Sequence, residues 1–404
     1  MVAPCSRCGS ANMDRRPELV AGHPRIRCTC RACGHDALLT PELALSSAGG
    51  GLRELALRHI TPPPPAAPEL VRAILDAPDD DAPRLVYADW LMERGDPRGE
   101  HIALQCRPAR FEGDVFERAW RLEAEHAVMW LAPLRALLAD PAPMHFTRGF
   151  VERLVLDAGD WIAHGAAICE LTPVREVELR RVESLAAVLA TPATARLRAI
   201  EVRGQRLEIG DLARVPPLPR LESLALLDCR LPSLALQQLA ALPATPRALY
   251  LDRNPACGTG LPYLVHHSRL LSRIERLSLD YVSLVPTHVR LLERVADTLR
   301  ALSVDHTELD GAALATIARA VPLVELSAAA TREIDDTTLA ALGQHGALRV
   351  LRLPRCELRI TPRGLAALLA ALPQLATLDL QRCDLPEAEY RPLLARYPDA
   401  CGWS

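Results

Sequence analysis

The stretch Leu221-Glu-Ser-Leu224-Ala-Leu226-Leu-Asp-Cys229 contains the pattern that decides the fold. Aliphatic residues occupy its first, fourth and sixth positions, and a cysteine occupies the ninth. The pattern returns every 22–28 residues along most of the chain, a spacing typical of repeat proteins. Its copies begin at Val151, Val174, Leu197, Leu221, Pro246, Ile274, Leu299, Val321, Leu348 and Leu375.

Each copy predicts a short strand followed by a helix. The fourth and sixth positions alternate with polar ones, so a strand buries them on one face. Between copies the apolar spacing becomes helical. After Thr361-Pro362, a cap and a proline suited to a first turn, one stripe of leucines runs from Leu365 to Leu372 and ends before Pro373. One such unit cannot bury its apolar face alone, so stacked units must share a continuous core.

This block resembles the leucine-rich repeat family, particularly its longer, cysteine-bearing, helix-containing class. The resemblance implies an α/β solenoid of about ten strand–helix repeats, with a curved parallel sheet and a concave interaction surface. The ninth position faces the turn after each strand, where a Cys or Asn can bond backbone groups. We therefore expect structural roles for Cys229, Asn254, Cys356 and Cys383.

Composition narrows the class of protein. The chain has 404 residues and a net charge of −3, and all 47 of its basic residues are arginines, so nothing predicts a polyanion partner for the whole chain. We find no apolar run long enough to span a membrane and no cleavable leader. The sequence predicts a cytoplasmic protein with no membrane contact, whose 12 cysteines serve as metal ligands or buried thiols.

Two Cys-x-x-Cys-Gly motifs near the N-terminus predict a metal site. The first contains Cys5 and Cys8, and the second contains Cys30 and Cys33. Four thiolates suit tetrahedral Zn²⁺, so we expect one structural zinc ion per chain. A redox-active thiol pair is the alternative, but it needs a βαβ context that is absent here. Cys28 and His35 lie close enough in sequence to substitute for a ligand.

Residues 1–35 resemble the zinc-ribbon family. A segment this short cannot bury an adequate core, so we expect the metal to supply its folding energy. The segment carries more arginines than carboxylates, which gives some support for contact with DNA or RNA. A solvated arginine surface is the alternative interpretation. Residues 36–67, with a glycine run at 49–51 and a proline run at 62–65, are predicted to be a linker.

Residues 68–143 are predicted to form a helical domain that caps the repeats, and residues 144–404 the solenoid with its own C-terminal cap. We expect helices at 69–77 and at 83–94, the latter stopped by Gly95 and burying Leu85, Val86, Trp90 and Leu91. The run Ala82-Pro-Arg-Leu-Val-Tyr-Ala-Asp-Trp-Leu-Met-Glu-Arg-Gly-Asp-Pro-Arg-Gly-Glu100 closely resembles the repeat-companion domain, a helical module that precedes repeat arrays in some bacteria. That resemblance implies an architecture and no reaction.

An acidic run in this domain offers two interpretations. Asp79, Asp80, Asp81, Asp89, Glu93 and Asp96 could form a site for a hard cation, but such a site needs carboxylates that converge on one point. Consecutive residues at a helix start diverge instead, which favours capping and solvation.

No motif of an enzyme occurs. The sequence has no phosphate loop, nucleophile elbow or His-Glu-x-x-His, and no cysteine has the context of an activated thiolate. Cys401, near the end, is the one thiol that merits labelling. A peptidase or ligase is therefore disfavoured, and we expect a non-enzymatic interaction protein.

The concave face suggests where a partner binds. The third, fifth and seventh positions face outward, and the seventh-position row reads Asp157, Arg180, Arg203, Leu227, Asp252, Asp280, Asp305 and Ser327. Like charges on neighbouring strands repel. Tyr250 adds an aromatic residue of a kind enriched in interfaces. Tyr250, Asp252, Asp280 and Asp305 are thus predicted to bind a basic segment of a protein, unless Arg253 and Arg276 neutralise the aspartates.

Two functions follow from these features. The first is a protein–protein interaction scaffold that uses the concave face, with the zinc ribbon as a second contact. The alternative is a nucleic-acid-associated adaptor, in which the ribbon contacts DNA or RNA and the repeats recruit a partner.

Overall fold

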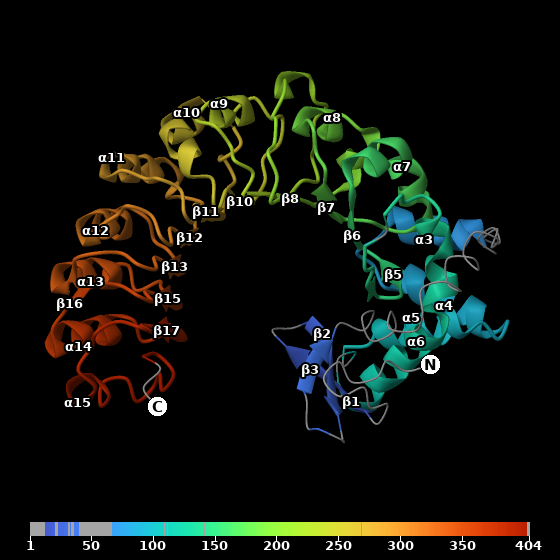
Figure 1. The fold of residues 1–404 in the computed structure, drawn as a ribbon, viewed down its shortest axis with the longest axis horizontal. Coiled ribbons are helices and arrows are strands. Elements are labelled where there is room, and N and C mark those ends of the chain that lie inside the picture. The colour runs from blue at the N-terminus through green and yellow to red at the C-terminus, as the bar shows by residue number, and fades with distance from the viewer. Residues whose placement is uncertain are drawn as a thin grey trace. The chain divides into compact units, whose positions relative to one another are not determined.

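The computed structural model describes residues 13–20, 23–30, 33, 36–39, 67–108, 110, 112–140, 142–267 and 269–401. It divides the chain into two compact units, Met1–Arg175 and Glu176–Ser404. The first repeat strand therefore belongs to the same unit as the helical domain, and the remaining repeats form the second unit (Figure 1).

The first unit contains eleven described elements. They are β1 (Met13–Val20), β2 (His23–Cys30), β3 (Asp36–Leu39), α3 (Pro68–Asp76), α4 (Ala82–Met92), α5 (Pro97–Gln105), α6 (Gly113–Arg135), β4 (Phe146–Thr147), β5 (Phe150–Val151), β6 (Arg153–Asp157) and α7 (Ala158–Leu171).

β1, β2 and β3 form an antiparallel sheet in which Met13 pairs with Cys30 and Ile26 pairs with Leu39. β3 lies beyond residue 35, so the sheet continues into the first residues of the segment predicted to be a linker. The backbone of Cys30 ends β2, and Cys33 lies in the turn that follows.

The helical domain follows the local sequence signals. α3 and α4 begin one residue before the predicted helices, and both carry a proline in their first turn. Gly95 has a φ of 72°, which ends the α4 segment in the left-handed region that glycine favours. The Asp96 carboxylate then accepts a hydrogen bond from the Arg98 N–H at 2.9 Å and so caps α5.

The predicted buried face of α4 is partly wrong. Leu85 and Val86 are 41% and 54% exposed. The buried stripe instead comprises Arg84, Tyr87, Ala88 and Leu91, one helical turn apart. An arginine can occupy this stripe because Glu152, distant in sequence, compensates its charge at 2.8 Å.

The second unit is built on nine parallel strands. They follow each other in space in the order β7 (Glu176–Arg180), β8 (Ala199–Arg203), β9 (Ser223–Leu227), β10 (Ala248–Tyr250), β11 (Arg276–Ser278), β12 (Ala301–Ser303), β13 (Glu325–Ser327), β15 (Val350–Arg352) and β17 (Thr377–Asp379). Their fourth and sixth cassette positions are buried, as predicted, except that Val324, the predicted fourth position of the copy assigned to Val321, is only half-buried.

Helical segments occupy the connections between these strands and lie on the outer, convex side of the unit, while the strands line its inner, concave side (Figure 1). They are α8 (Leu185–Leu189), η1 (Pro192–Arg196), η2 (Leu212–Arg214), α9 (Ala235–Leu239), η3 (Pro255–Gly260), α10 (Leu261–His267), α11 (Pro286–Val289), η4 (Arg290–Val295), α12 (Gly311–Ala320), α13 (Asp336–Gly343), α14 (Pro362–Ala371) and α15 (Glu387–Tyr390). Two short strands, β14 (Ile334–Asp335) and β16 (Leu358–Arg359), pair within these connections. The second unit is therefore an α/β solenoid with the leucine-rich-repeat-like architecture that the resemblance implied.

One cassette begins two residues later than predicted. Leu302 pairs with Leu326, and Leu326 pairs with Leu351, so Leu326 occupies the fourth position of its repeat. The copy assigned to Val321 therefore starts at Leu323. The sequence misled us because Val321 and Leu323 are both aliphatic and both buried.

No helix in the described part of the chain is long and apolar enough to cross a membrane.

Candidate binding surface

The backbone after each strand turns in the same way throughout the second unit. The residue at the eighth cassette position adopts a positive φ in all nine repeats: Arg181, Gly204, Asp228, Arg253, Tyr281, His306, Ala330, Arg355 and Arg382. From Gly204 to Arg355, its N–H donates to the seventh-position carbonyl of the next repeat, for example from Arg253 to Asp280 at 2.7 Å. This repeated turn places the seventh and eighth side chains in parallel rows.

The three predicted aspartates stack in one of these rows, and each is bonded to the next repeat. Asp252 Oδ1 accepts hydrogen bonds from the Ser278 hydroxyl at 2.5 Å and from the Asp280 N–H at 3.1 Å. Asp280 Oδ1 accepts bonds from the Ser303 hydroxyl at 2.6 Å and the Asp305 N–H at 2.8 Å. We call this arrangement the aspartate–serine ladder.

The ladder ends at the repeat whose start was misassigned. Asp305 Oδ1 accepts from the Ser327 hydroxyl at 2.8 Å and from the Ala329 N–H at 2.7 Å. Ser327 lies beside Ser303, at the fifth position, so its predicted place in the seventh-position row is wrong. Ala329 occupies that row instead.

The arginines predicted to neutralise the aspartates do not do so by direct contact. The Arg276 guanidinium pairs with Glu325 at 3.2 Å. The Arg253 guanidinium carbon lies 4.7 Å from the centre of the Tyr281 ring and exerts a weaker, longer-range effect on Asp252. Hydroxyl and amide donors, which carry no full charge, hold the carboxylates in place, so the negative charge of the row remains on the surface.

Burial shifts the acidity of the ladder. Desolvation raises the pKa of Asp252, and the bonds from Ser278 and from the Asp280 N–H lower it in part. Burial likewise raises the pKa of Asp280 to about 6, against the opposing bonds from Ser303 and from the Asp305 N–H. Negative charges on the neighbouring aspartates add to both increases, so the carboxylates disfavour one another as anions.

A stacked row lies next to the ladder, and the sequence analysis missed it. The ring centres of Tyr281 and His306 are 4.5 Å apart and the ring planes are inclined by 12°. The Arg253 guanidinium lies over the Tyr281 ring. These three residues all occupy the eighth position of consecutive repeats. Reading the eighth position along the array, as was done for the seventh, would have revealed the row.

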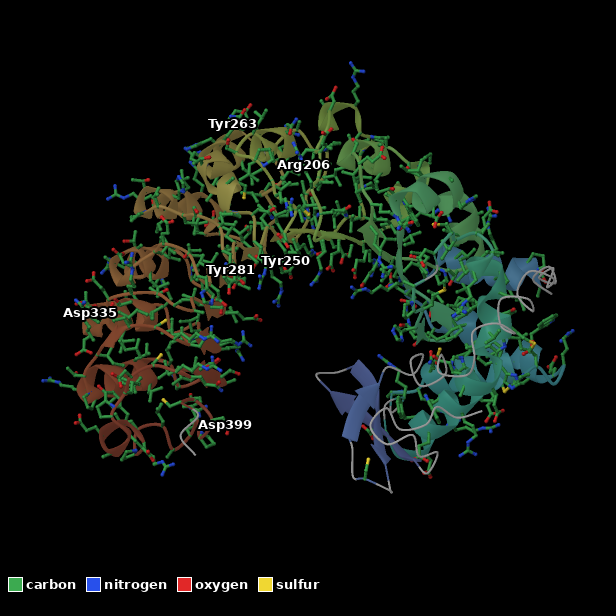
Figure 2. The ribbon with its side chains drawn as sticks, viewed as in Figure 1. Arg206, Tyr250, Tyr263, Tyr281, Asp335 and Asp399 are labelled. Atoms are coloured by element: carbon green, nitrogen blue, oxygen red, sulfur yellow. The ribbon has the colours of Figure 1, made fainter. Side chains whose placement is uncertain are left out.

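The concave face carries its aromatic residues near the ladder. Figure 2 shows Tyr250 and Tyr281 on the inner, strand-lined side of the second unit, with Tyr263 on the outer side. Tyr250 is half-buried and Tyr281 is 40% exposed. Nearer the start of the unit, the Arg203 guanidinium bonds the Glu201 carboxylate, so these two charges neutralise each other.

The ninth position is structural, as expected. Asn254 Oδ1 accepts bonds from the N–H groups of Cys229 and Leu231, at 2.9 and 3.1 Å, and its amide nitrogen donates to three carbonyls. The thiols of Cys229, Cys356 and Cys383 donate to carbonyls of the preceding repeat.

Burial raises the pKa of Cys229 and of Cys356 to about 12, and that of Cys401 to about 11. Thiols with such pKa values carry little thiolate at neutral pH. Cys401 is therefore a poor target for labelling, in contrast to its selection from sequence.

The predicted zinc ligands lie mostly outside the described residues. Cys5 and Cys8 belong to the part of the chain that the structure does not describe, and for Cys30 it describes the backbone alone. Cys33 is exposed in its turn. The zinc site remains a prediction.

The acidic run of the helical domain pairs with arginines. Asp79 bonds the Arg175 guanidinium at 2.5 Å, and Asp81 bonds Arg148 at 3.1 Å. Asp80 accepts a bond from the Ala82 N–H at 2.9 Å, whereas Asp81, at the N-cap of α4, makes no side-chain capping bond. Asp79 and Asp81 are therefore paired as well as solvated, since their side chains are 60% and 42% exposed. Among the described residues, no group of His, Cys, Asp or Glu has the geometry of a metal site.

Comparisons with known proteins add little to this description. No protein-family model and no curated protein matches the sequence. Solved structures that match include a TLR13–ssRNA13 complex, with a TM-score of 0.40 and 18% identity over 60% of this chain and 34% of that one. An internalin (inlF) from Listeria monocytogenes matches with a TM-score of 0.34 and 13% identity, over 60% of this chain and 71% of that one. The chain thus spans about a third of the first of these proteins.

Proposed function

We propose that this chain is a non-enzymatic interaction scaffold whose concave face binds a basic segment of a partner protein. The binding site comprises Tyr250, Asp252, Asp280 and Asp305, and the predicted zinc ribbon serves as a second contact module. The observation that carries this proposal is the aspartate–serine ladder, which holds three carboxylates in register with no cation in direct contact among the described residues.

Electrostatics favours a cationic partner at this place. Each aspartate has one oxygen committed to the next repeat, and burial together with the neighbouring charges raises the pKa of Asp252 and Asp280. A guanidinium or ammonium group placed against the row would relieve that repulsion and bond the remaining oxygens. Tyr250 and Tyr281 provide aromatic surface on which such a segment can pack.

Synthetic peptides test this proposal without a known partner. Neighbouring strands lie about 4.8 Å apart and an extended chain rises about 3.4 Å per residue, so arginines at alternate positions can reach successive aspartates. We would measure binding of a fluorescent peptide of alternating arginine and alanine to the full chain. A peptide with citrulline in place of arginine has the same shape without the charge and serves as the ligand control.

The decisive comparison uses two triple variants. Asp252→Asn, Asp280→Asn and Asp305→Asn together should weaken binding on the order of thirtyfold, because three charge pairs are lost. The matched control replaces Glu293, Asp297 and Glu389, which are exposed in or beside the helical segments η4 and α15, with the corresponding amides. Equal weakening in both triples, or equal binding of the citrulline peptide, would reject the site.

A further inference from the structure

A cavity of about 210 Å³ lies inside the first unit, where helices α3 to α7 meet the β4–β5 hairpin. Its wall is mainly aromatic and aliphatic, with Tyr87, Trp130, Leu131, Leu134, Phe146 and Phe150 as its larger members. An apolar cavity of about 150 Å³ is enough to hold benzene. This cavity therefore has room for one small ring with a short substituent.

One cation belongs to this apolar wall. The backbone of Arg98 is fixed at the start of α5 by the Asp96 cap, and its guanidinium carbon lies 5.0 Å from the centre of the Phe150 ring. Its Nε atom is buried and has no hydrogen-bond partner among the described residues. Burial lowers the pKa of Arg98, against longer-range effects of Tyr87 and Asp96 that raise it.

A second arginine at the same ring shows what Arg98 lacks. The Arg84 guanidinium carbon lies 5.2 Å from the centre of the Phe150 ring. It bonds the Glu152 carboxylate at 2.8 Å and the carbonyls of Pro78 and Arg148 at 2.9 and 3.1 Å. Arg98 has no such set of acceptors in the described part of the chain. The residue is half-buried, and its Nε is the guanidinium atom that is both buried and without a partner there.

The other polar residues of the wall do not supply the missing anion. The Thr172 hydroxyl donates to the Val151 carbonyl at 2.8 Å and accepts from its N–H at 3.1 Å. Glu170 is exposed, and no ion pair joins it to Arg98 within the described residues. Among the described residues, no carboxylate of the wall is paired with the Arg98 guanidinium, which leaves it open to an anion brought by a ligand.

We propose that this cavity binds a small aromatic carboxylate, with its ring among Trp130, Phe146 and Phe150 and its carboxylate on the Arg98 guanidinium. A charge-assisted bond in an apolar enclosure is stronger than the same bond in water. The aromatic wall gives the ring its van der Waals contacts. This site lies in the helical unit and does not depend on the proposed role of the concave face.

Three probes separate the contribution of the aromatic ring from that of the negative charge. We would titrate the full chain with benzoate, benzamide and acetate and follow binding by ligand-observed NMR and calorimetry. Benzoate should bind saturably with one site per chain. Benzamide keeps the ring and loses the charge, whereas acetate keeps the charge and loses the ring. Each should bind at least about tenfold more weakly than benzoate. Absence of saturable benzoate binding, or equal binding of benzamide, would overturn the proposal.

Variants test whether the benzoate carboxylate binds the Arg98 guanidinium. Arg98→Met should weaken benzoate binding about ten- to hundredfold, while benzyl alcohol, which is uncharged, still binds. Arg98→Lys keeps the cation and should retain more benzoate affinity than the methionine variant. Arg94→Met is the matched control, because the Arg94 guanidinium is half-exposed over Trp90, which is absent from the wall. Circular dichroism establishes that each variant is folded, and unchanged benzoate binding in Arg98→Met would refute the assignment.

Discussion

Asn254 shows how one side chain joins two repeats. It is fully buried and completes five hydrogen bonds, two accepted from the preceding repeat and three donated to carbonyls. Gln205, also at a ninth position, has the same role on a smaller scale, with bonds to Val182 N–H at 2.8 Å and the Leu179 carbonyl at 3.2 Å. The polar residue at this position therefore satisfies the backbone where two turns stack.

We predict that Asn254→Ala lowers the free energy of unfolding by about 3–5 kcal/mol, because it leaves buried N–H and carbonyl groups without partners. Gln205→Ala, which removes fewer bonds, should cost about 1–2 kcal/mol. Chemical denaturation of both variants measures the difference. A loss in Asn254→Ala no greater than that in Gln205→Ala would contradict this account.

The raised pKa of Asp280 predicts a dependence of stability on pH. Its folded pKa of about 6 exceeds the usual aspartate value of 3.8, so folding favours the protonated form. This contribution to stability is complete below the unfolded pKa and is lost as pH rises through about 6. At pH 7.5 the ionised carboxylate is therefore a net cost to the folded state.

Asp280→Asn removes that cost while its amide oxygen can still accept both bonds. We expect the variant to be more stable than the parent by on the order of 1–2 kcal/mol at pH 7.5, with partial exposure reducing the effect. The difference should shrink as pH falls from 7.5 to 4.5. Denaturation series at several pH values measure it, and a difference that is constant with pH would disprove the assignment.

Among the elements of the first unit, α4 depends most on contacts from distant sequence. Glu152, between β5 and β6, lies 2.8 Å from both Arg84 and Arg148 and 3.6 Å from the Arg175 Nε. The same arginines bond the loop before α4 through Pro78, Asp79 and Asp81. Glu152 thus contacts three guanidiniums, with Asp79 and Asp81 as further carboxylates for two of them, and attaches α4 to the hairpin.

We predict that Glu152→Gln destabilises the first unit by about 3–5 kcal/mol, because it leaves the buried Arg84 guanidinium without a carboxylate partner. Arg72→Gln breaks only an exposed pair with Asp76, 3.9 Å apart, and should cost less than about 1 kcal/mol. Hydrogen exchange within α4, compared with exchange in β8 to β13, reports the first unit separately. Equal protection of α4 in both variants would count against this network.

The junction of the β4–β5 hairpin with α5 requires glycine. Gly149 has a φ of 80°, and a Cβ at this position would overlap the side chain of Ile102. Gly95 also has a positive φ, 72°, but a Cβ there would meet open space. A substitution at Gly149 therefore tests steric overlap together with backbone strain, whereas one at Gly95 tests backbone strain alone.

Gly149→Ala should destabilise the first unit by about 3 kcal/mol or more, from strain and overlap together. Gly95→Ala should cost about 1–2 kcal/mol, from strain alone. Thermal denaturation of the two variants compares them. Equal losses of stability in the two variants would mean that the Ile102 side chain can move away from the added methyl group without destabilising the unit.

For the molecule as a whole, the division into two compact units predicts independent responses. We expect one zinc ion per chain, bound by Cys5, Cys8, Cys30 and Cys33, with the metal required for the small β1–β3 sheet and not for the repeats. Metal analysis and hydrogen exchange with and without a chelator test both expectations. Cys5→Ser with Cys30→Ser should abolish zinc binding.

Cys229→Ser serves as the control, since this buried thiol belongs to the repeats and should leave the zinc content unchanged. Two results would refute the zinc prediction: no zinc in the parent chain, or full zinc content in the double variant. Loss of protection throughout β7 to β17 on chelation would show that the two units are not independent.

Local pattern was enough to predict the solenoid. The alternation of buried fourth and sixth positions, and the cap at Thr361, are properties of neighbouring residues, so they specify strand and helix directly. The three aspartates were also placed correctly on adjacent strands, because a constant repeat brings equivalent positions together. Where two apolar residues compete for one position, as Val321 and Leu323 do, the pattern alone gives the wrong start.

Which side chains pair between repeats, or between segments distant in sequence, could be seen only in the folded chain. Whether Asp252 bonds an arginine or a serine is settled by strand register, which places Ser278 within reach and directs Arg276 to Glu325. Likewise Arg84 occupies a buried stripe only because Glu152 approaches it from another element. Side-chain alternation is local, whereas the free energy of a buried charge depends on its partner, and that partner is fixed only when the chain has folded.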